Sequence, residues 1–249
     1  MKFDSVLAVR SSKTVYREGD RCVKVFDEGY SKQDVLNEAL NHARVEATGL
    51  NIPELLEVTT IDGKWAIVTR FIEGKTLTQL MAENPDDKDK YIDLLVNLQI
   101  QIHERTCPLL NKLKDSMGRK LCLTELAATT RFDLYTRLDA MPRHSKICHG
   151  DFHPSNVIIA EDGTPYIIDW SHATQGNASS DAAGTYLSFR ILGDKAGAEK
   201  YLELFCEKSK TDKQYVFKWI PIVAAAKSIS SDEDVKEQLL YWVDSTDFE

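Results

Sequence analysis

Three polar side chains near the middle of the chain are of types and spacing that suit phosphoryl transfer. Asp151 and Asn156 lie five residues apart in the segment His-Gly-Asp-Phe-His-Pro-Ser-Asn, and Asp169 follows a short apolar run. A hairpin between them would bring Asp169 back to the centre that Asn156 faces. Carboxylate and amide oxygens suit Mg²⁺, which binds through one or two carboxylates together with substrate phosphates. Asp151 is then left to accept a proton from a hydroxyl group, as phosphoryl transfer requires.

This pattern, H-G-D-x-H-x-x-N followed by I-D-W, resembles the motif of the aminoglycoside phosphotransferases and of the choline, homoserine-type and thiamine kinases. The resemblance covers nearly the whole chain and weakens in the last forty residues. It implies the two-lobed fold of the protein kinases. It also implies that Asp151 is the catalytic base, that Asn156 and Asp169 hold the metal ion, and that the two histidines of the motif support the loop.

The resemblance further implies a pair of residues that binds the nucleotide. Lys24 stands between two valines on a short strand, and Glu38 lies in the helix that follows. In the resembled fold, a strand lysine binds the α- and β-phosphates and is held by a helix glutamate. Glu46, two helical turns further along, is the competing partner for Lys24.

Two further segments are expected to touch the nucleotide. The turn at Ser11 and Ser12 occupies the place of the phosphate-covering loop, but it lacks the glycines of the protein kinases. Hydroxyl and backbone N–H groups can still approach phosphate there. The segment from Arg70 through Ile72 to Gly74 resembles the hinge that binds the purine through its main chain. Main-chain contacts do not distinguish ATP from GTP, so we expect ATP, with GTP as the alternative.

Asp181 begins a predicted helix eleven residues after the I-D-W motif. The resemblance implies that it buttresses the catalytic loop, whereas local sequence alone favours a helix N-cap. Either role is structural.

The elements that must position these residues change in type along the chain. Residues 1–73 favour a small antiparallel sheet with one helix, and residues 74–249 favour a mainly helical lobe that carries one hairpin. The fold class is therefore α+β, with a nucleotide-binding lobe at 1–73 and a lobe for catalysis, metal and acceptor at 74–249. The expected strands of the first lobe are Ser5–Val9, Lys13–Arg17, Arg21–Phe26, Glu54–Thr60 and Trp65–Phe71.

Helix signals are also present. Ser31 is suited to begin the first helix, and Leu36, Leu40, Ala43 and Ala47 form a stripe expected to face the core. Asp62-Gly63 predicts a tight hairpin turn. Later helices are expected at about 121–138, 181–192, 195–208, 213–229 and 232–243, with a kink or restart at Pro221.

Composition narrows the functional classes. The chain of 249 residues has 31 basic and 39 acidic residues, a net charge of −8, which disfavours binding to nucleic acid or to an anionic membrane. Five cysteines are scattered without a C-x-x-C pair, and no apolar run is long enough for a membrane span. We therefore expect a cytoplasmic protein with free thiols. The sequence does not predict an oligomeric state.

The favoured hypothesis is a kinase of a small hydroxyl-bearing molecule, such as an aminoglycoside, choline or another alcohol. A nucleotide-binding, pseudokinase-like scaffold is the alternative, and a protein kinase is disfavoured because no A-P-E segment follows Asp169. Residues 232–249 carry seven carboxylates and one lysine, which suits a cationic acceptor or simply a solvated helix end. Four aromatic residues near this end are candidates for an amine-binding wall or for core packing (Tyr215, Trp219, Tyr241 and Trp242).

Overall fold

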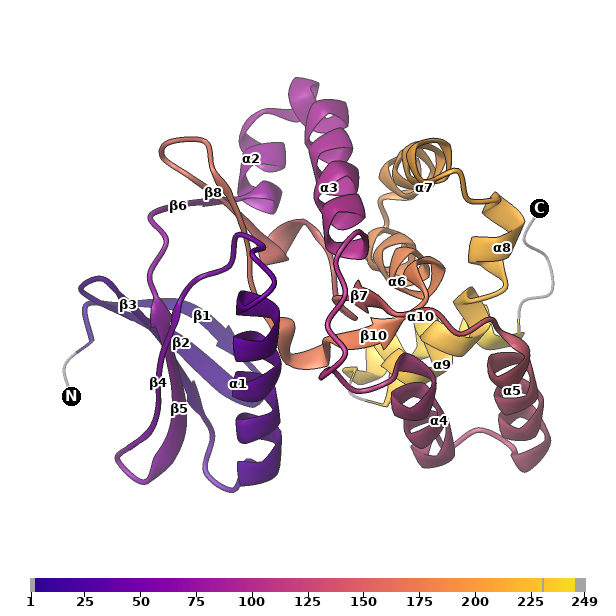
Figure 1. Ribbon diagram of the computed structural model, residues 1–249, viewed down its shortest axis with the longest axis horizontal. Coiled ribbons are helices and arrows are strands. Elements are labelled where there is room, and N and C mark those ends of the chain that lie inside the picture. The colour runs from indigo at the N-terminus through magenta and orange to yellow at the C-terminus, as the bar shows by residue number, and fades with distance from the viewer. Residues whose placement is uncertain (1–2, 230, 245–249) are drawn as a thin grey trace. The chain divides into compact units, whose positions relative to one another are not determined.

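Short runs rich in β-branched residues form an antiparallel sheet at the start of the chain, as predicted. The computed structural model describes residues 3–229 and 231–244 (Figure 1). Its largest sheet has the strand order β1-β2-β3-β5-β4. The strands are β1 (Ser5–Arg10), β2 (Lys13–Glu18), β3 (Arg21–Phe26), β4 (Leu55–Ile61) and β5 (Lys64–Arg70). The β4–β5 turn places Asp62 and Gly63 at φ of 50° and 80°, the left-handed backbone that an Asp-Gly hairpin turn uses.

Helix α1 (Lys32–Glu46) covers this sheet (Figure 1). Ser31 caps it by accepting a hydrogen bond from the Asp34 N–H group, as the sequence predicts. The predicted buried stripe is wrong, however, because Leu36 and Leu40 are 44% and 47% exposed. The buried face is rotated by about one residue along the helix and consists of Val35, Glu38, Ala39, Asn41, His42 and Val45. This rotation turns Glu38 inward.

A second, three-stranded sheet carries the hairpin that the motif predicted. Its strand order is β6-β8-β9. The strands are β6 (Gly74–Thr76), β8 (Val157–Ala160) and β9 (Pro165–Ile167). Helix α2 (Leu77–Glu83) follows β6, and the 3₁₀ turns η2 (Pro154–Asn156) and η3 (Trp170–His172) flank the hairpin. The pairing of Val157 with Ile167 brings the two ends of the hairpin together.

The remaining elements are mainly helical. The 3₁₀ turn η1 (Pro85–Asp87) leads into the helices, and the short strands β7 (Lys146–Cys148) and β10 (Thr174–Gly176) pair antiparallel. The helices are α3 (Lys88–His103), α4 (Leu113–Leu123), α5 (Ala128–Ala140), α6 (Ala178–Ile191), α7 (Lys195–Ser209), α8 (Lys213–Phe217), α9 (Ile220–Ser228) and α10 (Glu233–Asp244).

Two of the predicted helices differ from those observed. The helix expected at 121–138 is divided, because Thr124 turns to an extended backbone and ends α4. The helix expected at 213–229 is also divided, and α9 restarts with Pro221 in its first turn, as the proline predicted.

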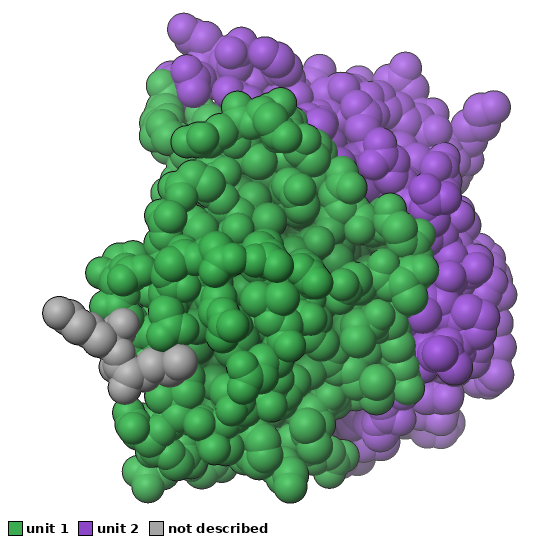
Figure 2. All heavy atoms as spheres, turned by 60° about the vertical axis from the view of Figure 1, so that its left-hand side comes forward, with its two compact units in different colours: residues 1–83, 154–172 green, residues 84–153, 173–249 purple. Residues whose placement is uncertain are grey.

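The chain folds as two compact units, coloured green and purple in Figure 2. Unit 1 comprises residues 1–83 and 154–172, and unit 2 comprises residues 84–153 and 173–249. The hairpin of β8 and β9 therefore belongs to unit 1. In the described part of the chain, no helix combines the length and the apolar character that crossing a membrane requires.

Candidate active site

Lys24 and Glu38 form the ion pair that the sequence predicted in unit 1. Lys24 Nζ, on β3, donates a hydrogen bond to Glu38 Oε1, on α1, over 2.5 Å. The competing residue, Glu46, instead accepts the backbone N–H of Leu55, over 3.2 Å. Both members of the pair are largely buried, with side chains 18% and 9% exposed. Burial lowers the pKa of Lys24, but attraction to Asp169 and Glu38 outweighs it, so the pKa is raised and the ammonium stays charged.

Asp169 joins this pair and brings in a second lysine. Its Oδ1 lies 3.3 Å from Lys24 Nζ, and its Oδ2 lies 3.5 Å from Lys13 Nζ, on β2. Asp169 has a φ of 63°, a left-handed backbone that a non-glycine residue rarely adopts and that is typical of functional sites. Sequence reasoning gave Lys13 no role. In the structure, Val15 pairs with Lys24, and Lys13, two residues before Val15, lies on the same face of the sheet as Lys24. Strand alternation was therefore the sequence signal that could have found Lys13.

The hairpin of β8 and β9 places Asn156 beside the segment that leads to Asp169. The Ile168 N–H donates to the Asn156 carbonyl over 3.0 Å. Asn156 is buried, and the indole N–H of Trp170 donates to the Ile167 carbonyl over 3.1 Å. Two side chains with oxygen ligands are therefore fixed at the same end of one hairpin. Such a donor set fits Mg²⁺, which needs few protein ligands when phosphates supply the others.

The other residues predicted to contact the nucleotide are Ser11, Ser12, Arg70 and Ile72. Ser11 and Ser12 form the turn between β1 and β2. Arg70 donates its backbone N–H to the Glu54 carbonyl over 2.8 Å, and its guanidinium binds Asp20 and Glu54. The main-chain N–H of Arg70 is therefore already engaged. Ile72 makes no such bond to the described residues, so it is the better hinge candidate of the two.

In unit 2, Asp181 buttresses the loop that carries the predicted base, Asp151. It accepts the backbone N–H groups of His149 and Gly150 over 3.0 and 2.7 Å, and it lies 3.1 Å from His103 Nε2. Burial raises the pKa of Asp181, but His103 and the other donors outweigh it, so the pKa is lowered. Asn177, not Asp181, caps α6. The loop role that the resemblance implied is the one observed.

The predicted base, Asp151, is held by a lysine that no motif predicted. Lys227 Nζ, on α9, donates to Asp151 Oδ1 over 2.6 Å, and His153 Nε2 lies 3.5 Å from Asp151 Oδ2. Burial raises the pKa of Asp151, but attraction to Lys227 and His153 outweighs it and leaves the pKa well below its usual range. Asp151 is therefore a carboxylate at neutral pH, able to accept a proton.

Lys120, in the last turn of α4, is the third residue to which sequence reasoning gave no role. Burial lowers its pKa, and so does its proximity to Lys227, whereas Asp151 acts in the opposite direction. Among the described residues, the Lys120 ammonium has no hydrogen-bond or ion-pair partner. Lys120 lies in a basic segment with Lys112, Lys114 and Arg119. Such a run of charges is usually a solvated surface, so the sequence held no signal for this position.

The four aromatic residues named as candidates for an amine-binding wall differ in burial and in partners. Trp219 is fully buried, Tyr241 is 70% exposed, and Tyr215 accepts a hydrogen bond from Asn177 over 2.7 Å. Trp242 packs against Tyr186 and lies under the Arg190 guanidinium at 4.7 Å. Of the acidic residues near the C-terminus, Asp247 and Glu249 lie outside the described residues.

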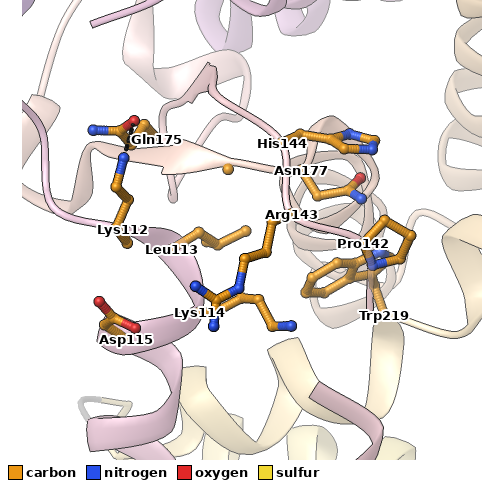
Figure 3. A pocket seen from close by; sticks show the side chains of 11 residues that line it. Lys112, Leu113, Lys114, Asp115, Pro142, Arg143, His144, Gln175, Asn177 and Trp219 are labelled. Carbon is orange, nitrogen blue, oxygen red and sulfur yellow. Dashed lines mark hydrogen bonds between the residues drawn. The ribbon is translucent and has the colours of Figure 1, made fainter. Parts of the chain in front are cut away.

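Unit 2 also contains a pocket of about 260 Å³ that is separate from the catalytic loop (Figure 3). Pro142, Arg143 and His144, which precede β7, line the pocket, whereas Asp151 follows β7 and does not line it. Figure 3 shows that the Lys112 ammonium donates a hydrogen bond to Gln175 Oε1, over 2.6 Å. Arg143 and Trp219 also line the pocket. None of the residues predicted to bind the nucleotide or the metal, or to act as the base, lines this pocket, whereas Trp219, a candidate for the amine-binding wall, does.

Comparison with solved structures finds the same fold at low sequence identity. An aminoglycoside phosphotransferase APH(4)-Ia variant, solved as a ternary complex with AMP-PNP and hygromycin B, has a TM-score of 0.70 and 14% identity, over 96% of this chain and 92% of that chain. A choline/ethanolamine kinase family protein from Mesorhizobium loti has a TM-score of 0.66 and 14% identity, over 97% and 88%. Choline kinase LicA from Streptococcus pneumoniae has a TM-score of 0.62 and 17% identity, over 96% and 94%.

The sequence itself carries the family signature. A search of curated proteins returned no match. The profile of the phosphotransferase enzyme family matches residues 6–215, which is most of the chain. The α+β fold and the resemblance seen in the motif are therefore confirmed, and the chain belongs to the phosphotransferase enzyme family.

Proposed function

We propose that this phosphotransferase moves the γ-phosphoryl group of ATP, or of GTP, to a hydroxyl group of a small molecule. The observation that carries the proposal is the bonding of Lys24 to both Glu38 and Asp169. This constellation positions nucleotide phosphates in the kinases that share the fold. In the proposal, Lys24 and Lys13 bind phosphate oxygens, and Ile72 presents its main chain to the purine. Ser11 and Ser12 lie over the phosphates.

Asn156 and Asp169 would hold Mg²⁺. Among the described residues, no three histidine, cysteine or acidic side chains gather into a metal cluster, so phosphate and water oxygens would complete the coordination. What the ion supplies when bound is neutralisation of charge on the phosphate oxygens. With Asp169 committed to the metal, Lys24 would keep Glu38 as its carboxylate partner, and its ammonium would be available to the phosphates.

The transfer step assigns one task to Asp151. The acceptor hydroxyl gives its proton to the Asp151 carboxylate while its oxygen forms a bond to the γ-phosphorus. The bond from that phosphorus to the bridging oxygen breaks, and the nucleoside diphosphate leaves. Asp181 positions the loop through two backbone N–H groups, and Lys227 orients Asp151 through Oδ1.

The test combines nucleotide binding with turnover. We expect Mg²⁺-dependent binding of a fluorescent ATP analogue, and release of ADP when a hydroxyl acceptor is supplied. Lys24→Met should weaken the binding at least tenfold, because charge-assisted contacts to phosphate are lost. Lys64→Met removes a lysine at the far end of the same sheet and should change nothing. Binding without transfer to any acceptor would favour the scaffold alternative, and absence of Mg²⁺-dependent binding would refute the proposal.

A further inference from the structure

The pocket of about 260 Å³ in unit 2 is formed by the start of α4, the segment before β7 and the end of β10 (Figure 3). Its volume exceeds the roughly 150 Å³ of a cavity that holds benzene, and it is close to the ~300 Å³ of the smallest ordinary ligand pockets. The side chains to which the function proposed above assigns the nucleotide, the metal and the proton transfer do not line it. A ligand in this pocket would therefore occupy a second site.

Gln175 fixes one of the cations in the wall of this pocket. Its buried amide group donates to the carbonyl oxygens of Pro108 and Leu110, both over 2.7 Å. Its Oε1 accepts a hydrogen bond from Lys112 Nζ over 2.6 Å, and this is the one bond that the Lys112 ammonium makes to the described residues. An ammonium group has three donors, so two remain for a ligand. A lysine of an ordinary solvated surface has no buried amide to hold it in place.

The other polar side chains of the wall also have donors to spare. Arg143 and His144 are exposed, and neither has a hydrogen-bond or ion-pair partner in the described part of the chain. Trp219 is fully buried, and no acceptor among the described residues reaches its indole N–H. The amide acceptors are already used, since Asn177 Oδ1 accepts the Ser179 N–H over 3.0 Å, as Gln175 Oε1 accepts Lys112. The wall therefore suits a ligand that is rich in acceptors.

The charge of the wall has the matching sign. Lys112, Lys114 and Arg143 line the pocket, and Asp115 is the single carboxylate among its described lining residues. Lys114 donates to two backbone carbonyl oxygens over 2.6 and 2.8 Å, and it lies 3.9 Å from Asp139 Oδ1. With Lys114 counted against Asp139, two cations still face one carboxylate. The start of α4 adds to this field, because the N-terminus of a helix favours negative charge.

We propose that this pocket binds a small organic anion, a carboxylate or phosphate group on an apolar body of about the size of one aromatic ring. Lys112 and Arg143 would bind the anionic group. Leu113, Pro142 and the indole of Trp219 would pack against the apolar body, since they supply the hydrocarbon part of the wall. The inference does not depend on the function proposed above.

A charge series on one ring tests the inference by equilibrium binding to the full chain. The probes are benzoate, phenyl phosphate, benzamide and benzylamine, each titrated calorimetrically. We expect at least one of the two anions to bind about tenfold or more tightly than the neutral amide and the amine, the range of a charge-assisted hydrogen bond. Comparison of benzoate with phenyl phosphate distinguishes a carboxylate site from a phosphate site. The indole N–H resonance of Trp219, identified by its loss in Trp219→Phe, should shift when that anion is added to nitrogen-labelled protein.

Arg143→Met should abolish the preference for the anion, because it removes an exposed cation from the wall and leaves the core of unit 2 intact. Arg119→Met is the matched control, since Arg119 is an exposed arginine of α4 that does not line the pocket, and this variant should retain the preference. Lys24→Met removes a cation of the proposed nucleotide site in unit 1 and should retain the preference as well.

Four results would overturn the inference. They are undetectable binding of both anions at millimolar concentration, equal affinity for anion and amide, an unchanged preference in Arg143→Met, and a Trp219 resonance that stays in place at saturation. Loss of the preference in Lys24→Met would also overturn it, because the anion would then occupy the phosphate site of unit 1. None of these results refutes the kinase function, which is tested separately by Mg²⁺-dependent nucleotide binding and transfer.

Discussion

Each unit of the protein contains an aspartate bonded to a lysine, and the two clusters differ in their partners. In unit 1, Asp169 and Glu38 face Lys24 and Lys13, so each lysine is held by a carboxylate. In unit 2, Asp151 bonds to Lys227 and lies 3.5 Å from His153 Nε2. The first cluster joins several groups of both signs, and the second keeps one carboxylate ionised.

This difference suits two tasks. A Mg²⁺–nucleotide brings both positive and negative charge, so it would exchange partners with the first cluster: the metal would take Asp169 and the phosphates the lysines. The second cluster keeps Asp151 able to accept a proton. The comparison predicts that variants of the two clusters will change different steps of one reaction.

The largest expected effect separates the clusters by chemistry. Asp151→Asn should reduce kcat by roughly 10²–10⁴-fold, because the amide cannot accept the hydroxyl proton. Nucleotide affinity should be nearly unchanged, since the substitution lies in unit 2. Steady-state ADP release and nucleotide titration measure the two quantities, with Asp133→Asn, a change at an exposed ion pair on α5, as the control. Near-full activity of Asp151→Asn would show that the base lies elsewhere.

The next effect ranks the two ligands that we assign to the metal. Asp169→Ala should weaken Mg²⁺-dependent nucleotide binding by about tenfold or more, and by more than Asn156→Ala, because a charged ligand contributes more than a neutral one. In the absence of Mg²⁺, the loss in Asp169→Ala should be smaller, since Lys24 and Lys13 are then released to bind phosphate. Titration of Mg²⁺ against a fluorescent nucleotide checks both statements. An equal or reversed order would disprove the ranking.

Much of the unit 1 cluster could be predicted, because its members lie in patterns with a fixed meaning. A lysine within a strand, a glutamate on the following helix and an aspartate after a hairpin are set by local periodicity, and the structure brings all three together. The prediction that failed there was the buried face of α1. A search for apolar residues chose Leu36 and Leu40, but the inward face carries polar Glu38, which is buried for its partner Lys24.

The unit 2 cluster could be predicted only in part. Asp151 belongs to a motif, whereas Lys227 lies 76 residues after it, on a helix with no motif of its own. Only the packing of α9 within unit 2 brings Lys227 to the loop that carries Asp151.

The pH dependence of Lys227→Met tests how the unit 2 cluster controls the ionisation of Asp151. Lys227 holds the pKa of Asp151 below its usual range against the effect of burial. Lys227→Met removes the strongest of the attractions that oppose burial, so the pKa of Asp151 should rise. The acid limb of kcat/KM reports ionisation of the base in the free enzyme, and it should therefore move to higher pH. Lys227→Arg should restore the unmodified limb. A limb that stays in place in Lys227→Met would mean that Lys227 does not set the ionisation of the base.

The smallest expected effect distinguishes two glutamates of one helix. Glu38→Gln weakens the hold on Lys24 without removing the lysine, so the nucleotide KM should rise several-fold and kcat should change less. Glu46→Ala should leave the nucleotide KM unchanged, because Glu46 accepts the Leu55 N–H and does not contact Lys24. Its effect should be on folding, with a loss of about 1 kcal/mol in the free energy of unfolding, the usual size for one hydrogen bond. Parallel KM and denaturation measurements on the two variants test this division. If Glu46→Ala raised the nucleotide KM as much as Glu38→Gln does, the ion pair would not be specific to nucleotide binding, and the balance of charges in unit 1 would reflect stability alone.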